Sequence, residues 1–279
     1  ATGALSTGLT TITGSAATGA LDLNISSNTN NLTMTLGSGD DRVEAGTVGT
    51  NLTADDTWDL GTGTNTLAIN DTSLTAGDIT NIKSVTGVSV LEFTTTTAES
   101  TYDANAIGTL NTFVLSGAIT DAAGAAGTDG ETTSAGTAAN NQALSLTGVE
   151  DGDAFTLKEN ITGGVGGAGG AIDDAAEQTG GAGGAGSAGL VLTEELVGGT
   201  NTASLVLSGA TITGGAGGAG GDAAEIEGDG VGGAGGAGAV GVDAATFETI
   251  NIQSSTAANT IAGGAGGAAG DSEDDGAAA

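Results

Sequence analysis

Residues 214–221 read Gly-Gly-Ala-Gly-Gly-Ala-Gly-Gly, and this three-residue repeat decides the fold that we expect. A strict period of three fits neither an α-helix, with about 3.6 residues per turn, nor a β-strand, with about two. It fits polyproline-II geometry, which has three residues per turn and rises by about 3.1 Å per residue. In that geometry every third side chain points to one side, and the bare glycine positions let neighbouring backbones approach closely.

The same repeat recurs through the second half of the chain. Further runs occupy residues 163–170 (GGVGGAGG), 180–186 (GGAGGAG), 232–238 (GGAGGAG) and 263–267 (GGAGG). The runs form outward and returning pairs around acidic turns, except for the last, which has no returning partner. A single run should be disordered, because glycine loses more backbone entropy on folding than any other residue. We therefore expect hairpins that pack side by side, with flexible Gly-Ala linkers as the alternative.

Residues 1–120 are rich in Thr and Asn and carry short alternating patterns that predict β-strands. These patterns lie at residues 21–25 (LDLNI), 32–36 (LTMTL) and 67–69 (LAI). Residues 36–43 (LGSGDDRV) and 60–67 (LGTGTNTL) match in form, and this recurrence of a strand with a glycine turn suggests stacked β-solenoid coils. Residues 74–83 are a candidate helix, although their threonines lower the helix propensity.

A second repeat links the two halves of the chain. Residues 113–120 (FVLSGAIT) resemble residues 205–213 (LVLSGATIT), and each precedes an Ala/Gly-rich excursion. Other strand-like pieces lie at residues 144–146, 155–157, 190–192 and 247–252. The predicted fold is all-β: a β-solenoid-like or β-sandwich scaffold with projecting polyglycine-II hairpins and little or no helix. We divide it into a Thr/Asn-rich strand region, 1–120, and a region of strands and Gly-Gly-Ala hairpins, 121–279.

The composition excludes several classes of function. With 34 acidic and three basic residues and a net charge of −31, the chain has no basic footprint for nucleic acid. It has no Cys and no His, so it lacks disulfides and the Ser-His-Asp, Cys-His and His-bearing zinc sites. A carboxylate pair could hydrolyse glycosides, but the few aromatic residues that would hold a sugar are scattered. We therefore expect that the protein is not an enzyme. We also expect no membrane insertion, because no stretch has about 18 consecutive apolar residues.

An acidic surface of this kind favours a hard cation, and Ca²⁺ prefers carboxylate and carbonyl oxygens. Residues 37–43 fit most of the nonapeptide G-G-x-G-x-D-x-U-x, with Leu36 in the place of the first glycine. In that motif, backbone carbonyls of the tight turns and the aspartate surround Ca²⁺. The candidate ligands are Asp40 and Asp41 in this turn, Asp55, Asp56 and Asp59 further on, and Asp173, Asp174, Asp222 and Asp229 at the hairpin tips. The alternatives are a solvated β-turn for the motif and solubilising caps for the acidic clusters.

Residues 36–43, with residues 58–63 (WDLGTG) and the strands around them, resemble bacterial surface-layer proteins and calcium-dependent secreted, RTX-like repeat proteins. Residues 246–252 (TFETINI) have the same character. This resemblance implies export without disulfides and folding or assembly with Ca²⁺. The Gly-Gly-Ala runs resemble polyglycine-II bundle proteins, which include a Gly-rich antifreeze protein and the receptor-binding tips of some phage tail fibres.

Together these patterns predict a non-enzymatic extracellular structural protein that self-assembles into a surface layer or filament with Ca²⁺. Its main partner would be further copies of itself, and a cell-surface polysaccharide is a second candidate partner. Two alternatives remain open from the sequence. One is an adhesin that presents its acidic hairpin tips to a receptor, and the other is an ice-binding protein with a flat Ala/Thr face.

Overall fold

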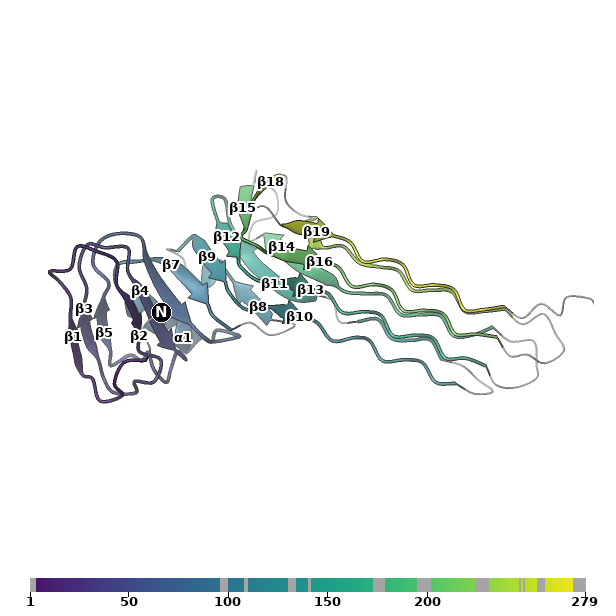
Figure 1. Cartoon of the computed structure of the whole chain (residues 1–279), viewed down its shortest axis with the longest axis horizontal. Coiled ribbons are helices and arrows are strands. Elements are labelled where there is room, and N and C mark those ends of the chain that lie inside the picture. The colour runs from purple at the N-terminus through teal and green to yellow at the C-terminus, as the bar shows by residue number, and fades with distance from the viewer. Residues whose placement is uncertain are drawn as a thin grey trace, which may run out of the picture.

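A computed structural model shows a body of strands from which extended glycine-rich segments project together in one direction (Figure 1). The first strands lie at one end of the body, and the segments leave from the other end. The structure describes residues 4–95, 100–107, 110–129, 134–139, 142–172, 179–194, 202–223, 231–245, 247, 249–254 and 259–272.

The largest sheet has eight strands in the order β18-β15-β12-β9-β7-β6-β4-β2. They are β2 (Asp22–Asn24), β4 (Arg42–Gly46), β6 (Asn65–Ile69), β7 (Val88–Phe93), β9 (Thr112–Leu115), β12 (Ala154–Leu157), β15 (Thr202–Leu207) and β18 (Thr249–Ser254). Neighbouring strands come from successive turns of the chain, and each pair is parallel. The sheet therefore grows by one strand per turn of the chain.

Three smaller parallel sheets complete the body. Their orders are β1-β3-β5, β17-β14-β11-β8 and β10-β13-β16-β19. The strands are β1 (Thr11–Thr13), β3 (Thr33–Thr35), β5 (Thr57–Asp59), β8 (Ser100–Asp103), β10 (Ile119–Thr120), β11 (Gln142–Val149), β13 (Ile161–Thr162), β14 (Ala188–Glu194), β16 (Thr211–Thr213), β17 (Val242–Asp243) and β19 (Thr260–Ala262). From β8 onward each turn adds one strand to each of three sheets and then leaves the body as a glycine-rich excursion.

The predicted all-β solenoid-like or sandwich scaffold with little or no helix is therefore wrong. The strands form four parallel sheets that do not close, with a short helix in one crossover, an arrangement closer to parallel α/β folds. The solenoid was inferred from a single repeat of 24 residues, and that repeat does stack: Arg42 pairs with Thr66 and Thr33 with Thr57. Later turns are longer because glycine-rich segments are inserted into them. The division at residue 120 stays a prediction.

Helix α1 (Ala76–Ser84) connects β6 to β7, close to the candidate helix at residues 74–83. Thr75 is its N-cap: the Thr75 hydroxyl accepts from the Asp78 amide, and the Asp78 carboxylate accepts from the Thr75 amide at 2.8 Å. Such a capping box satisfies two otherwise unpaired donors and offsets the low helix propensity of the threonines. A short 3₁₀ turn (Asn105–Ile107) follows β8.

The body has one hydrophobic core, built from rows of side chains that continue from strand to strand. Leu91, Phe113, Phe155 and Leu205 occupy equivalent positions on neighbouring strands, and each is at most 3% exposed. The rings of Phe113 and Phe155 stack with centroids 5.3 Å apart. Each turn of the chain therefore covers the apolar side chains of the turn before it.

The glycine-rich segments form a second, differently built region, which we call the arm bundle. Its members are arm 1 (121–129), arm 2 (134–139), arm 3 (163–172), arm 4 (179–187), arm 5 (214–223), arm 6 (231–240) and arm 7 (263–272). Backbone hydrogen bonds join the outward arms in the order 1-3-5-7 and the returning arms in the order 2-4-6. Further bonds join the two layers, as from the Gly218 amide to the Gly184 carbonyl at 2.8 Å.

The bonds between arms repeat every three residues, as the triplet sequence requires. The amides of Gly163, Gly166 and Gly169 in arm 3 donate to residues 213, 216 and 219, next to and within arm 5. In the inner arms the glycines are mostly buried, whereas the third residue of each triplet, as at Val165 or Ala182, is exposed. Backbone contacts therefore replace a side-chain core in this region.

Candidate functional site

The most distinctive surface of the body is the end formed by the outer strands β17, β18 and β19, which we call the open end. Ile252 on β18 continues the row of Phe155 and Leu205, yet it is 54% exposed. Ile261 on β19 likewise continues the row of Ile161 and Ile212 and is 36% exposed. These two residues have core-facing positions, but no further turn among the described residues covers them.

Strand β18 also leaves a long backbone edge uncovered. It has six residues with one paired neighbour among the described strands, β15, and five of the six are exposed. An edge strand of this length is a template for pairing with another chain, and proteins usually protect such edges with charges, proline or a bulge. Its sequence, TINIQS, contains neither charge nor proline. The open end is therefore both apolar and able to form hydrogen bonds.

The two edges of the arm bundle differ from each other. In arms 3 and 4, a methyl group at Gly164, Gly167, Gly181 or Gly184 would overlap a backbone carbonyl of the preceding arm in the same layer. The equivalent positions in arms 1 and 2, which have no preceding arm, are Ala122, Ala125, Thr128, Ser134 and Thr137. Side chains therefore seal the first edge of the bundle against a further arm.

At the last edge two glycines of arm 7, Gly263 and Gly266, are retained without a steric reason within the described residues, whereas Gly264, Gly267 and Gly270 pack against arm 5. A methyl group at Gly266 would meet only the Gly236 carbonyl, 3.8 Å away, and one at Gly263 only the Ala239 carbonyl, at 3.4 Å. Their counterparts in arm 5, Gly214 and Gly217, would overlap backbone atoms of arm 6. Gly263 and Gly266 thus keep the triplet sequence where no described neighbour requires glycine, and arm 7 lies on the same side of the molecule as the open end (Figure 1).

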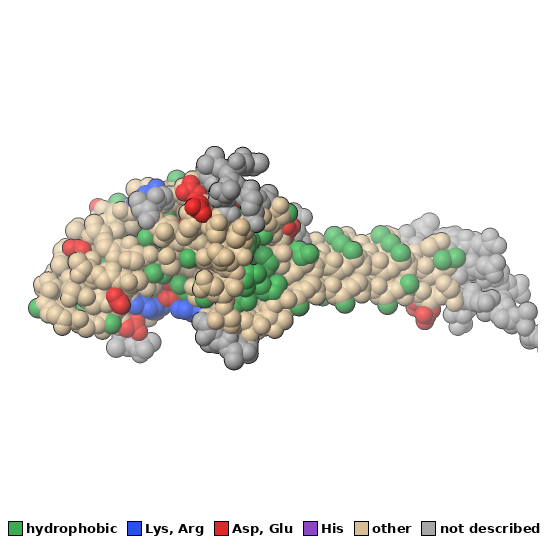
Figure 2. Space-filling model, turned by 90° about the horizontal axis from the view of Figure 1, so that it is seen from above, with side chains coloured by type: hydrophobic (Ala, Val, Ile, Leu, Met, Phe, Trp, Pro, Cys, Tyr) green, Lys and Arg blue, Asp and Glu red, His purple; other side chains and the backbone are tan. Residues whose placement is uncertain are grey.

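The bundle faces carry little charge. Figure 2 shows its described part as backbone studded with small apolar side chains, with further apolar side chains gathered where the bundle leaves the body. Asp129, Asp222 and Asp271 lie at the far ends of arms 1, 5 and 7, and the Asp222 carboxylate accepts from the Asp271 amide at 2.9 Å. With Asp121 at the base of arm 1, the carboxylates of the described arm residues therefore lie at the ends of the arms and not on their broad faces.

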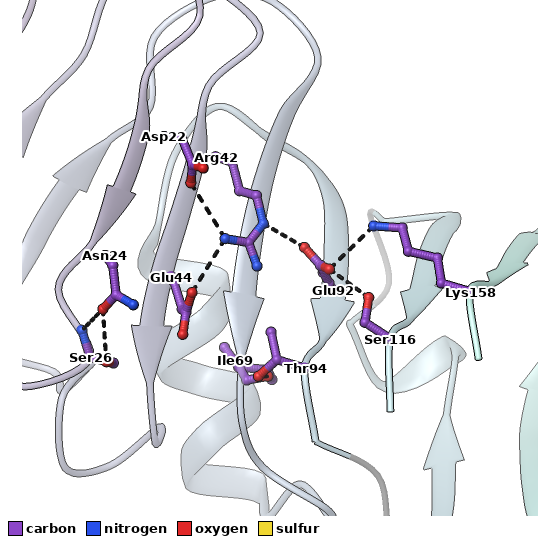
Figure 3. A network of polar contacts seen from close by, with 10 residues as sticks. All are labelled: Asp22, Asn24, Ser26, Arg42, Glu44, Ile69, Glu92, Thr94, Ser116 and Lys158. Carbon is purple, nitrogen blue, oxygen red and sulfur yellow. Dashed lines mark hydrogen bonds and ion pairs between the residues drawn. The ribbon is translucent and has the colours of Figure 1, made fainter. Parts of the chain in front are cut away.

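Two of the three basic residues of the chain meet at one carboxylate, Glu92 on β7 (Figure 3). Arg42 Nε donates to Glu92 Oε2 at 2.7 Å, while Lys158 Nζ lies 3.3 Å and Ser116 Oγ 2.6 Å from Glu92 Oε1. Arg42 on β4 reaches across β6 to Glu92 on β7, and the strand register places Ala68 of β6 between Glu44 and Glu92. The network ties β4 and β7 to residues that follow β9 and β12.

Several influences act on the pKa of Glu92. Burial by itself would raise this pKa, but the hydrogen bonds from Ser116 and Arg42 and the charges of Arg42 and Lys158 outweigh burial and lower it. The network has no signal in the sequence, because strand pairing brings together residues that are up to 66 positions apart. Each charged side chain in this network forms an ion pair with another member of it, and we call the network the charge brace of the body.

An acidic corner between β11 and β12 was also missed from the sequence. Asn105, Asn111, Glu150, Asp151 and Asp153 line a cavity of about 240 Å³. Asp153 is 6% exposed, and its carboxylate accepts from the Glu150 amide at 2.8 Å. Burial, together with the charge of Glu150 and against that backbone hydrogen bond, raises the pKa of Asp153. Adjacent aspartates and glutamates in a turn carry no sequence signal that separates such a corner from a solvated loop.

The structure separates the predicted metal ligands. Asp173, Asp174 and Asp229 lie outside the described residues. Asp55 and Asp59 are exposed. The Asp59 carboxylate accepts hydrogen bonds from the Gly61 amide at 3.0 Å and from the Thr86 hydroxyl at 3.1 Å. Asp222 is an exposed residue at the end of arm 5. Within the described ranges no group of three or more acidic side chains is arranged to hold a metal ion.

Asp40, Asp41 and Asp56 have structural roles in the stacked turns. Asp40 is exposed and accepts from the Thr64 amide at 2.7 Å. Both oxygens of Asp56 are satisfied, by the Leu32 amide at 2.7 Å and by the amide and hydroxyl of Thr53 at 2.7 and 3.0 Å. The carboxylates of Asp40 and Asp56 therefore bond to backbone groups within and between turns, without forming a metal cluster.

Asp41 stands apart from the other aspartates. It is 1% exposed, and its Oδ1 accepts from the Leu21 amide at 2.8 Å, but its Oδ2 is buried without a partner. The equivalent residue of the next turn is Asn65, whose side-chain amide donates to the carbonyls of Leu60 at 3.1 Å and Gly87 at 2.9 Å. Asp41 therefore places a carboxylate oxygen where the neighbouring turn uses an amide donor.

Comparison with protein-family models, with curated proteins and with solved structures finds no match for this chain. The part of the chain that the structure describes contains no helix with the length and apolarity needed to cross a membrane.

Proposed function

We propose that this protein is a non-enzymatic extracellular structural subunit that self-assembles into a filament or layer. The observation that carries the proposal is the open end, where the row of Phe155 and Leu205 ends on the exposed Ile252. Stacked repeat proteins normally need a polar cap on the last repeat, because each repeat buries its apolar face only against a neighbour. A second copy can supply the missing neighbour.

The contact that we propose joins unlike ends, β18 of one copy and, in the next, the turn that holds β2, where the Leu5 amide already donates to the Asn24 carbonyl at 2.7 Å. Such a heterologous contact generates open-ended polymers when the rotation between copies does not close. The sealed first edge of the bundle is compatible with this arrangement. The turns from β1 to β7 carry no arms, so the bundles of successive copies need not touch.

The test compares two equally exposed apolar residues. We expect wild-type protein to form concentration-dependent oligomers in sedimentation velocity and filaments or sheets in negative-stain electron microscopy. Ile252→Lys should raise the concentration needed for assembly at least tenfold, because it places a charge in the contact. Val231→Lys is the matched control: Val231 is also 54% exposed but lies on arm 6. A monodisperse wild-type monomer at high concentration, with or without Ca²⁺, would contradict the proposal.

We also propose that Ca²⁺ takes part, with Asp41 as its ligand. A cation at Asp41 Oδ2 would satisfy the buried oxygen that has no partner in the protein. Ca²⁺ should then raise the melting temperature of the wild type, and Asp41→Asn should abolish that dependence. Asp56→Asn, at a carboxylate with both oxygens satisfied, should lower stability but keep the response to Ca²⁺. A wild type that melts identically in Ca²⁺ and in chelator would exclude this site and leave assembly untouched.

The adhesin alternative depends on hairpin tips that lie largely outside the described residues, and it stays a prediction.

A further inference from the structure

The three-stranded sheet β1-β3-β5 presents two rows of threonine hydroxyls to the solvent. Its sequences are Thr-Ile-Thr, Thr-Met-Thr and Thr-Trp-Asp. The strands pair in register, so that Thr11, Thr33 and Thr57 form one row and Thr13, Thr35 and Asp59 the other. The middle residues, among them Met34 and Trp58, point into the core. The outer face is therefore a lattice made almost entirely of threonine.

The lattice is regular and stiff. Neighbouring strands in a sheet lie about 4.8 Å apart, and alternate residues along a strand about 6.6 Å apart, so the hydroxyls form a rectangular grid. Threonine is restricted at χ1 by its β-branch, which limits the orientations that each hydroxyl and methyl can take. Binding by such groups costs little conformational entropy, because the sheet and the rotamers are ordered beforehand.

Within the described part of the chain, the threonine hydroxyls of this face are free to bind a partner. Among the described residues, the side chains of Thr11, Thr13, Thr33, Thr35 and Thr57 make no hydrogen bond. The one charged member, Asp59, stands at the corner of the grid, where the Gly61 amide and the Thr86 hydroxyl hold its carboxylate. The face thus offers alternating hydroxyl and methyl groups at fixed spacings and almost no charge, in a chain whose net charge is −31.

These features limit what can bind. Protein partners are usually anchored by Trp, Tyr or Arg side chains, and none of these stands on the outer face of β1, β3 and β5. A polysaccharide surface would need an aromatic platform, yet Trp58 is 2% exposed and faces inward. The partner that fits is itself a flat, periodic array of hydrogen-bonding groups with no charge. We infer that the β1-β3-β5 face binds ice, through hydroxyls and methyls that hold a layer of ordered water.

This inference concerns the opposite end of the body from the open end and does not rest on the proposed assembly. The test measures the fraction of protein retained on a slowly grown ice surface, together with inhibition of ice recrystallisation. Wild type should be retained and should inhibit recrystallisation. Thr33→Lys, at the centre of the grid, should lose at least tenfold in both measurements, since the long charged side chain breaks the flat surface.

The control is Thr156→Lys, which introduces the same change at an outward position on β12 of the large sheet and should leave both measurements unchanged. Thr13→Lys on the edge strand β1 provides a second grid variant, should Thr33→Lys fail to fold, and it should also lose ice retention. Absence of retention and of inhibition in the wild type would overturn the inference. Equal losses in Thr156→Lys and the grid variants would do the same, as would binding to crystalline cellulose but not to ice.

Discussion

The body and the arm bundle are packed in opposite ways, the body through large side chains and the bundle through its backbone. In the body, side chains such as Phe155 and Leu205 fill the space between sheets, and the backbone bonds run within each sheet. In the bundle, the arms bond to neighbours in two directions, and a Cβ at Gly218 would overlap the carbonyl of Gly167. Large apolar residues stabilise the first region, whereas the absence of any side chain stabilises the second.

This difference means that the two regions should respond to mutation in opposite ways. Loss of side-chain volume should harm the body, and gain of volume should harm the bundle. It also shows how an acidic chain can build a long projection without an apolar core: the arms expose only small side chains and keep their carboxylates towards their ends.

The largest effect that we expect is in the body. Phe155→Ala removes a ring that is 1% exposed and stacked on Phe113, and it should lower the free energy of unfolding by about 4 kcal/mol. The fluorescence of Trp58, the single tryptophan and a residue of the body core, reports this transition in denaturant. A change below about 1 kcal/mol would mean that the rows of the core do not pack as described.

A smaller effect, confined to the bundle, should follow from one added methyl group. Gly217→Ala should destabilise the bundle by about 3 kcal/mol, because the methyl meets the backbone of arm 6, which cannot move aside. Gly266→Ala, at the equivalent position of arm 7, should change stability by less than about 1 kcal/mol. Hydrogen exchange of the arm amides measures both variants, while Trp58 fluorescence should show the body unaffected. Equal effects of the two substitutions would remove the distinction between inner and edge arms.

The smallest effect concerns the charge brace of the body. Glu92→Gln should cost about 1.5 kcal/mol at neutral pH, since charged hydrogen bonds to Arg42 and Ser116 are weakened. The pKa of Glu92 is lowered in the folded state, so its contribution is complete above the ordinary value of 4.5 and disappears as the pH falls below it. Wild type and variant should therefore converge in urea titrations at acidic pH. A difference that persists there would assign the effect to packing instead of charge.

Local patterns predicted much of the secondary structure. The alternating runs at residues 32–36 and 67–69 fall on β3 and β6, and the 24-residue repeat corresponds to stacked turns. The scaffold was predicted wrongly, because a period-two pattern specifies a strand but not the sheet to which it belongs. The inserted arms also hide the similarity of later turns.

The candidate site was harder to predict than the strands. The motif around Asp41 identified an unusual residue, but the partnerless Oδ2 depends on the pairing of residues 41 and 65 in adjacent turns. The exposure of Ile252 and Ile261 depends on which strand is outermost, and no local pattern encodes that. By contrast, two of the three strands of the threonine face read Thr-x-Thr in the sequence, but the register that aligns the threonines comes only from strand pairing.

The central claim is that the arms are an ordered bundle held by backbone hydrogen bonds, and residue-resolved amide exchange tests it most directly. In arms 3, 4 and 5 both glycine amides of each triplet donate, whereas in the described residues the alanine amides at 168, 182 and 216 do not. We predict a period-three pattern with two slow amides in three, falling to one in three along arm 7, where Gly264 and Gly267 donate. Uniformly fast exchange along every arm would show that the triplets are linkers and would contradict the account.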